Sequence, residues 1–151
     1  MAEHPEQKRL VPSRQQQAIV SVLRTTAYLR RFGSSLFDQH GITPQQYNVL
    51  RILRGAGQEG LPTLDIVDRM IEQTPGITRL LDRLEAKKLV RRERPSDNRR
   101  QVLCYVTKDG RDLLSELETP MKNLANEALH MLNDSELDEL IRLLERMRAT
   151  K

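Results

Sequence analysis

The sequence predicts a mainly α-helical chain with a small β-hairpin, and three observations support this prediction. Helix-capping signals recur along the 151 residues, apolar side chains follow them at three- and four-residue spacing, and one short segment alternates in polarity instead. At this length the chain forms about one domain. With one cysteine and three scattered histidines, we expect no disulfide framework, no metal site and no cofactor.

Capping boxes predict the first two helices. An S-x-x-Q box at Ser13 and Gln16 opens a helix that should run to about Gln39. Thr43 caps the second helix, with Pro44 at its first position, and the glycines of the following GAGQEG linker end it.

Two shorter helices follow, separated by about four residues, "IEQT". Thr63 is expected to cap the first, and Thr74 the second, with Pro75 at its first position. The residues expected to point inward are Leu64, Val67 and Met70 from the first helix and Ile77, Leu80, Leu81 and Leu84 from the second. Two helices joined in this way form a helix-turn-helix, whose second helix enters the major groove of DNA.

A basic hairpin is predicted directly after these helices. Residues 89–94 and 101–106 read as short strands, and "RPSDN" supplies the turn. Its arginines contribute nothing to a core, so they are either solvated or placed to meet a polyanion. A helix-turn-helix followed by such a hairpin is a winged helix, with the hairpin as its wing. The lone Cys104 falls on the inward side of the second strand, which favours a buried, inert thiol over a redox sensor.

The remaining segment is predicted to be helical throughout. Thr107 caps a helix that we expect to continue through Pro120 as a kink, because a break there would not preserve the apolar register; two separate helices are the alternative. Asn133 caps the last helix, with Glu136 at its third position.

Charge divides sharply along the chain. Residues 77–111 hold eleven Lys and Arg against five Asp and Glu, and residues 112–141 hold one Lys against eight acids. A basic segment next to an acidic one is typical of a nucleic-acid reader, because neutralised phosphates release counterions. The alternative is a solvated surface without a partner.

The terminal helices carry more apolar surface than one winged helix can cover, which favours a homodimer over an intramolecular three-helix packing. We therefore expect a dimerisation region at 13–40 and 111–149, a DNA-binding region at 42–110, and a disordered extension at 1–12. The expected dimer contacts are Ile19, Leu23, Met131, Leu137, Leu140, Leu144 and Met147.

Two stretches, "GITPQQYNVLRIL" and "TRLLDRLEAKKLVRRERPSDNRRQVLCYVTKDG", resemble the MarR family of bacterial transcriptional regulators. The family pattern D-x-L-E-x-x-G-L-V-x-R, then D-x-R, then L-T-x-x-G, is matched over most of its positions, and the resemblance covers about residues 13–149. One departure is Lys88, where the family usually has glycine, so another left-handed or strained residue is needed at this helix end.

The resemblance implies that Arg99 enters the minor groove from the wing and that Asp97 orients it. A guanidinium is attracted to the potential of a narrow, A·T-rich groove, whereas a surface Asp–Arg pair is the plain alternative. Arg79 is the candidate for a guanine contact, and phosphate contacts are expected from Arg83, Arg91 and Arg92. The full expected DNA-binding set is Thr74, Pro75, Gly76, Thr78, Arg79, Arg83, Arg91, Arg92, Asp97, Arg99 and Arg100.

The resemblance also implies a small anionic or aromatic effector in a crevice between the dimerisation helices and the winged helix. The candidate lining residues are Phe32, Phe37, His40, Tyr47 and Arg51, each of which has a plainer reading as a core or surface residue.

A cytoplasmic homodimeric repressor that reads a pseudo-palindromic operator on double-stranded DNA is the function that these patterns favour. No apolar run approaches the roughly 18 residues that span a membrane, and no Ser/His/Asp, Cys/His or phosphate-loop grouping predicts an enzyme. The alternatives are a protein-binding winged-helix adaptor and a sequence-tolerant architectural DNA-binding protein. DNA affinity that falls with salt separates the reader from the adaptor.

Overall fold

The structure is a computed structural model that describes residues 10–73 and 75–149, and its internal contacts divide the chain into two units, 1–33 and 34–151. The first unit contains most of helix α1 (Arg14–Gln39). The predicted capping box is present, since the Ser13 amide donates to Oε1 of Gln16 at 2.7 Å and the Gln16 amide donates to Oγ of Ser13 at 3.1 Å. Residues 1–9 of the predicted extension lie outside the described residues.

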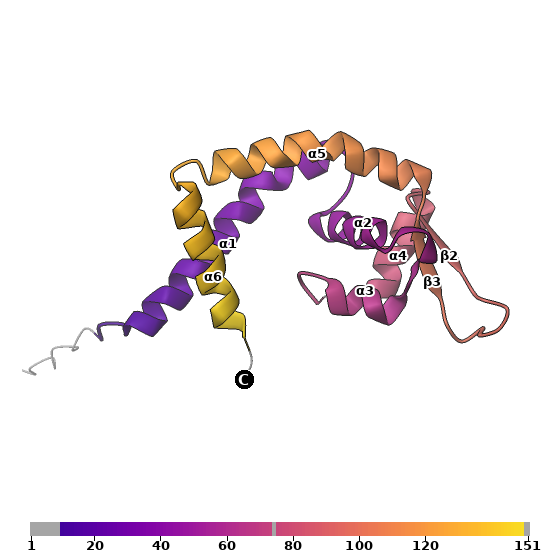
Figure 1. Cartoon of the computed structure of the whole chain (residues 1–151), viewed down its shortest axis with the longest axis horizontal. Helices are drawn as coiled ribbons and strands as arrows, with labels where there is room; N and C mark the ends of the chain where they lie inside the picture. Colours follow the sequence, from indigo (N-terminus) through magenta and orange to yellow (C-terminus); the bar gives the residue numbers. More distant parts are fainter. Residues whose placement is uncertain (1–9, 74, 150–151) are drawn as a thin grey trace, which may run out of the picture. The chain divides into compact units, whose positions relative to one another are not determined.

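The second unit holds the other elements (Figure 1). They are α2 (Pro44–Ala56), the 3-10 turn η1 (Gly57–Glu59), β1 (Leu61–Pro62), α3 (Thr63–Arg69), α4 (Ile77–Ala86), β2 (Val90–Glu93), β3 (Leu103–Val106), α5 (Lys108–Ala128) and α6 (Asp134–Arg148). The predicted class, mainly α with a small β element, is confirmed. None of the described helices is long and apolar enough to cross a membrane.

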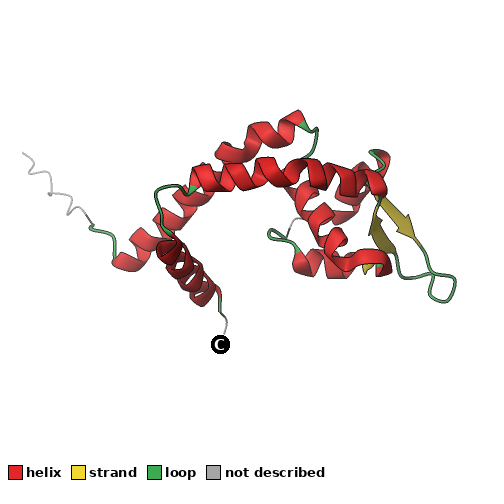
Figure 2. Cartoon of the chain, turned by 45° about the horizontal axis from the view of Figure 1, so that its top comes forward, coloured by secondary structure: helices red, strands yellow, loops and turns green. Residues whose placement is uncertain are grey.

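The predicted hairpin is part of a three-stranded antiparallel sheet with the order β1-β3-β2 (Figure 2). In the hairpin, Val90 pairs with Val106 and Glu93 with Leu103, so its strands are shorter than predicted. The third strand, β1, was missed because it has only two residues, and one of them is Pro62, which sequence patterns assign to a loop.

The core of this unit lies between α2, α3, α4, the sheet and the start of α5. Its fully buried side chains each contribute about 1.5–3 kcal/mol of burial free energy, and they include Leu50, Leu53, Ile66, Leu81, Leu84, Val90, Cys104 and Leu114. Burial raises the pKa of the Cys104 thiol, as expected for an inert cysteine. A second cluster joins Phe37 and Ile42 to Leu117 of α5.

Helix α3 differs from its prediction in two ways. Its N-cap is Pro62, not Thr63, and the Thr63 hydroxyl lies 4.0 Å from the Cys104 sulfur instead. The predicted inward residue Leu64 is 76% exposed, whereas Ile66 is fully buried. The reason is that α3 follows β1 directly, so the strand orients the short helix with Ile66 and Met70, four residues apart, toward the core.

The last two helices follow their predictions. Helix α5 is capped by Thr107 and continues through Pro120 without a break. The capping box of Asn133 and Glu136 opens α6.

Lys88 connects α4 to the wing in a left-handed conformation, with φ of 59°. This is the conformation required of a residue that replaces the glycine of the MarR pattern. The Thr107 hydroxyl donates to the Lys88 carbonyl at 2.7 Å. Gly110, in the first turn of α5, lies against the Leu89 backbone so closely that a Cβ there would be 2.4 Å from the Leu89 carbonyl oxygen. The base of the wing is therefore packed tightly against the start of α5.

Candidate nucleic-acid interface

Helix α4 begins later than predicted. Its N-cap is Gly76, with φ of 97° and ψ of 30°, and the first helical residue is Ile77. Pro75 therefore does not occupy the first helical position, and Thr74 lies outside the described residues. The left-handed conformation of Gly76 ends the turn and sets the direction of the helix that follows. Glycine adopts this conformation without a steric penalty. The connection from α3 is consequently seven residues, 70–76, instead of about four.

The two faces of α4 differ in exposure as the sequence predicts. Leu81 and Leu84 are buried, whereas the predicted contact residues at the helix start and on its outer face are exposed. Arg79 and Arg83 line a hollow of about 520 Å³ together with Pro75, Gly76, Leu80 and residues at the start of α2. The exposed contact residues are Pro75, Gly76, Thr78, Arg79 and Arg83.

A side chain that sequence reasoning missed holds the turn before α4. Oδ1 of Asn48, on α2, accepts a hydrogen bond from the Ile71 backbone amide at 2.9 Å. This bond fixes the turn on α2, although Ile71 itself is 83% exposed. A single asparagine within a helix gives no signal in the sequence for such a role.

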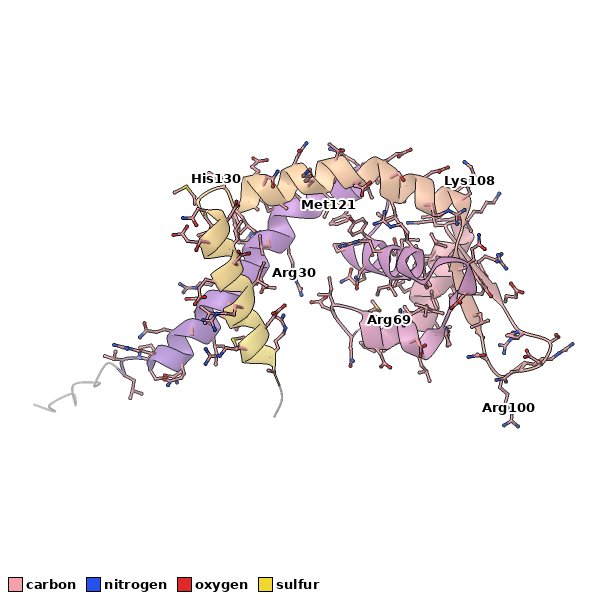
Figure 3. All side chains as sticks on the ribbon, in the orientation of Figure 1. Arg30, Arg69, Arg100, Lys108, Met121 and His130 are labelled. Carbon is pink, nitrogen blue, oxygen red and sulfur yellow. The ribbon has the colours of Figure 1, made fainter. Side chains whose placement is uncertain are left out.

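At the wing tip, Asp97, Arg99 and Arg100 are exposed. The loop is held from within, since Nη1 of Arg94 donates to the Arg99 carbonyl at 2.8 Å. Figure 3 shows Arg100 pointing away from the sheet at the end of this loop. Among residues 10–73 and 75–149, no ion pair joins Asp97 to Arg99, so the orienting role of Asp97 stays a prediction.

The structure separates Arg92 from the other arginines. Its side chain, 23% exposed, forms ion pairs with Asp82 and, at 3.2 Å, with Glu85, both on α4. The Arg92 amide also donates to Oε2 of Glu85 at 3.1 Å. These hydrogen bonds from Arg92 lower the pKa of Glu85, and the carboxylate of Glu85 raises the pKa of Arg92. Arg92 thus connects the wing to α4, and the phosphate contact expected of it stays a prediction.

Arg91 lies on the opposite face of the hairpin. It forms an ion pair with Glu93, and its guanidinium carbon lies 4.3 Å from the centroid of the Tyr105 ring. The two neighbouring arginines therefore face different surroundings, because successive side chains on a strand point to opposite faces.

The residues predicted to line an effector crevice have different surroundings in the described part of the chain, and their role there stays a prediction. Phe37 and Tyr47 contact each other in the core, with ring centroids 5.3 Å apart, and Arg51 lies over the Tyr47 ring. His40 and Arg51 line separate hollows. Phe32 belongs to the first unit, where it contacts Tyr28.

Most of the residues predicted to form the dimer contact are exposed. Helix α6 has no buried residue, and Met131 before it is 81% exposed. Leu137 and Leu144 are half-buried. The other predicted positions are exposed: Ile19, Leu23, Leu140 and Met147.

Comparisons with known proteins agree with this architecture. Residues 31–117 match a family model described as transcriptional regulator SarA/Rot. A MarR transcription factor from Planctomyces limnophilus, known from its crystal structure, is 40% identical to this chain in sequence. The match covers 90% of this chain and 98% of that one, with a TM-score of 0.70.

Two further relatives are known by what regulates them or what they repress. Bordetella bronchiseptica BpsR, whose DNA binding is described as regulated by 6-hydroxynicotinic acid, is 25% identical, with 88% of this chain and 99% of that chain covered and a TM-score of 0.78. The homoprotocatechuate degradative operon repressor of Escherichia coli is 24% identical over 83% of this chain and 84% of that protein.

Proposed function

The chain belongs to the MarR family of transcriptional regulators, and from this premise we propose that it binds a pseudo-palindromic DNA operator as a homodimer and represses transcription. The observation that supports this proposal most directly is the pairing of two exposed basic surfaces. The outer face of α4 carries Arg79 and Arg83, and the wing tip carries Arg99 and Arg100.

In this proposal each surface meets a different part of DNA. Arg79, near the start of α4, hydrogen-bonds a guanine edge in the major groove, and Arg83 contacts phosphate. Pro75, Gly76 and Thr78 approach the same groove, because they precede or begin the exposed face of α4. Arg99 enters the adjacent minor groove, with Arg100 beside it on the backbone.

The homodimer is proposed from the apolar side chains that the described chain leaves uncovered. Helix α6 exposes Leu140, Ile141, Leu143 and Met147, and it buries no residue of its own. A second copy that covers this face creates a two-fold axis, and the two α4 helices then read half-sites about one helical turn apart, roughly 34–36 Å.

An effector that releases the repressor is the second part of the proposal, and it rests on the ligand named for BpsR. A small anionic or aromatic molecule fits the family relationship, and the residues first expected to hold it remain a prediction. We also place the regulator in the cytoplasm, where its DNA is, and assign it no catalytic activity.

Fluorescence anisotropy tests the DNA-binding proposal. The full chain is titrated with genomic fragments selected for binding and with random duplexes of equal length, at two salt concentrations. We expect tighter binding to the selected fragments and affinity that falls steeply with salt. Footprinting of a selected fragment should show protection of about two helical turns. Equal affinity for all duplexes would identify an architectural protein, and no affinity at low salt would identify an adaptor.

A further inference from the structure

A hollow at the base of the wing lies apart from the proposed DNA contacts. It measures about 450 Å³ and is lined by Arg54, Gly57, Gln58, Arg91, Tyr105, Val106 and Arg111. We call these residues the wing-root pocket. In Figure 3, Lys108, at the start of α5, marks the base of the hairpin, and Arg100 lies at the opposite end, at the tip.

Three arginines from three different elements line the wing-root pocket. Arg54 lies in the last turn of α2, Arg91 on β2 and Arg111 in the first turns of α5. No carboxylate lines the pocket among the residues that the structure describes. The nearest acid on the hairpin is Glu93, which pairs with Arg91 from the same strand. Like charges gathered in this way repel each other unless an anion lies between them.

Two of the three guanidinium groups are held in place. Arg91 and Tyr105 are partners across the hairpin, and the Arg91 guanidinium carbon lies 4.3 Å from the centroid of the Tyr105 ring. Nη1 of Arg111 donates to the Val106 carbonyl at 3.1 Å, and within the described part of the chain the guanidinium makes no other hydrogen bond. The side chain of Arg54 forms no hydrogen bond or ion pair within residues 10–73 and 75–149.

Helix stability does not account for Arg111. A positive charge in the first turns of a helix opposes the helix dipole, and α5 has Asp109 there as its favourable partner. Arg54 has the opposite position, at the end of α2, where a cation complements the dipole. The helix dipole therefore explains the position of Arg54 but not that of Arg111.

We propose that the wing-root pocket binds a small oxyanion with two or more negative charges, either a phosphate compound or a polycarboxylate. Guanidinium forks match both phosphate and carboxylate oxygens, which is the chemistry that these two sources share. The pocket shares only Arg91 with the residues expected to contact DNA, and it shares none with the predicted effector crevice. The proposal concerns the free protein, so it does not depend on the proposed operator binding.

Isothermal titration calorimetry on the full chain tests this proposal with pyrophosphate and citrate as probes, at constant ionic strength and with chloride as the reference anion. We expect saturable binding of at least one probe, and a preference between them identifies the source. Arg111→Gln should weaken binding by about tenfold, and a second variant, Arg91→Gln, should do the same.

The matched control is Arg148→Gln, which removes one positive charge from the exposed end of α6. It should bind the probe like the parent protein. Equal weakening by all three variants would show general charge attraction and overturn the proposal, as would the absence of saturable binding. Displacement of the probe by DNA of any sequence would also overturn it, because the pocket would then be part of the DNA surface.

Discussion

At the residue scale, the sequence revealed which arginines are exposed but not what each one contacts. Arg91 and Arg92 are adjacent and identical, and only the pleat of β2 sends one to Tyr105 and the other to Glu85. The pattern could have signalled this, since residues two apart share a face and Val90 is buried on the side of Arg92. The ion pairs themselves depend on where α4 lies, which no local pattern specifies.

Lys88→Gly should stabilise the protein. Lys88 holds a φ of 59°, which costs an L-residue about 1–2 kcal/mol, and part of the relief is offset by the greater freedom of glycine in the unfolded chain. The free energy of unfolding, measured with urea, should rise by roughly 0.5–1 kcal/mol.

Lys87→Gly is the matched control, because Lys87 has an ordinary φ of −81° and its side chain donates to Gln46 at 3.4 Å. This variant should lose stability. If both glycine variants destabilise the protein equally, the left-handed turn at Lys88 is not strained.

The arginines on the two DNA-facing surfaces should have separable effects. Arg99→Ala should weaken operator binding by about 1–3 kcal/mol and reduce the preference for A·T-rich flanks, because both charge and groove shape are lost. Arg79→Ala should instead relax discrimination at one major-groove position in each half-site. Binding to matched operator libraries at two salt concentrations measures both. An Arg99→Ala protein that binds like its parent would show that the wing tip is only solvated.

At the element scale, capping boxes were the most reliable predictors. Each box is local, and α1, α2 and α6 begin where the boxes indicate. The predictions that were wrong concern elements whose position depends on tertiary contacts. Helix α4 begins at Ile77, with Gly76 as its N-cap and Pro75 outside the helix, and the turn before it is held on α2 by Asn48. The two-residue strand β1 exists because β3 offers it a partner.

The connection between the wing and α4 gives a prediction about salt. If Arg92 pairs with Asp82 and Glu85 in the DNA complex as well, Arg92→Gln should weaken binding to all sequences by misplacing the wing. The slope of log affinity against log salt should stay unchanged, because no phosphate contact is lost. Arg83→Gln, at a proposed phosphate contact, is the comparison and should reduce the slope by about 0.9 per contact. A reduced slope in Arg92→Gln would show instead that Arg92 contacts phosphate, as the sequence predicts.

The pairing of Arg92 with Glu85 should make the stability of the protein depend on pH. The pKa of Glu85 is lower in the folded protein than in the unfolded chain, so its pairing stabilises the fold fully above the ordinary glutamate pKa of about 4.3. That contribution is lost as the pH falls through the lowered folded pKa. Denaturant unfolding between about pH 6 and pH 3 should therefore show a smaller acid-induced loss in Glu85→Gln than in the parent. Parallel curves for the two proteins would contradict the prediction.

At the scale of the whole molecule, periodicity predicted the uncovered apolar faces but could not show what covers them. Helix α6 carries leucines at helical spacing, yet it buries none of its residues within the described chain. Spacing is a property of one helix, whereas its partner is a property of the assembly. The division of labour between a DNA-binding part and a dimerisation part therefore remains a prediction.

Replacing Leu140 and Leu144 by glutamate should give monomers or unfolded chain, because two charges would enter the proposed apolar dimer contact. Sedimentation velocity measures the mass, and circular dichroism shows whether helices remain. Asp138→Lys, a charge change at an exposed polar position of α6, should leave the dimer intact. A stable monomer that still binds the operator with full affinity would contradict the dimeric reader.

The ion pairs of Arg92 have a consequence for the layout of the operator. Because they join β2 to α4, they tie the base of the wing to α4, and on the proposed DNA contacts we expect the protein to read two short sequence elements at one set spacing. One base pair inserted between the guanine near Arg79 and the A·T flank would rotate the flank by about a tenth of a helical turn. The protein would then lose the contribution of the flank altogether, even though both elements are still present, so a genome search for its operators must score spacing as strictly as sequence.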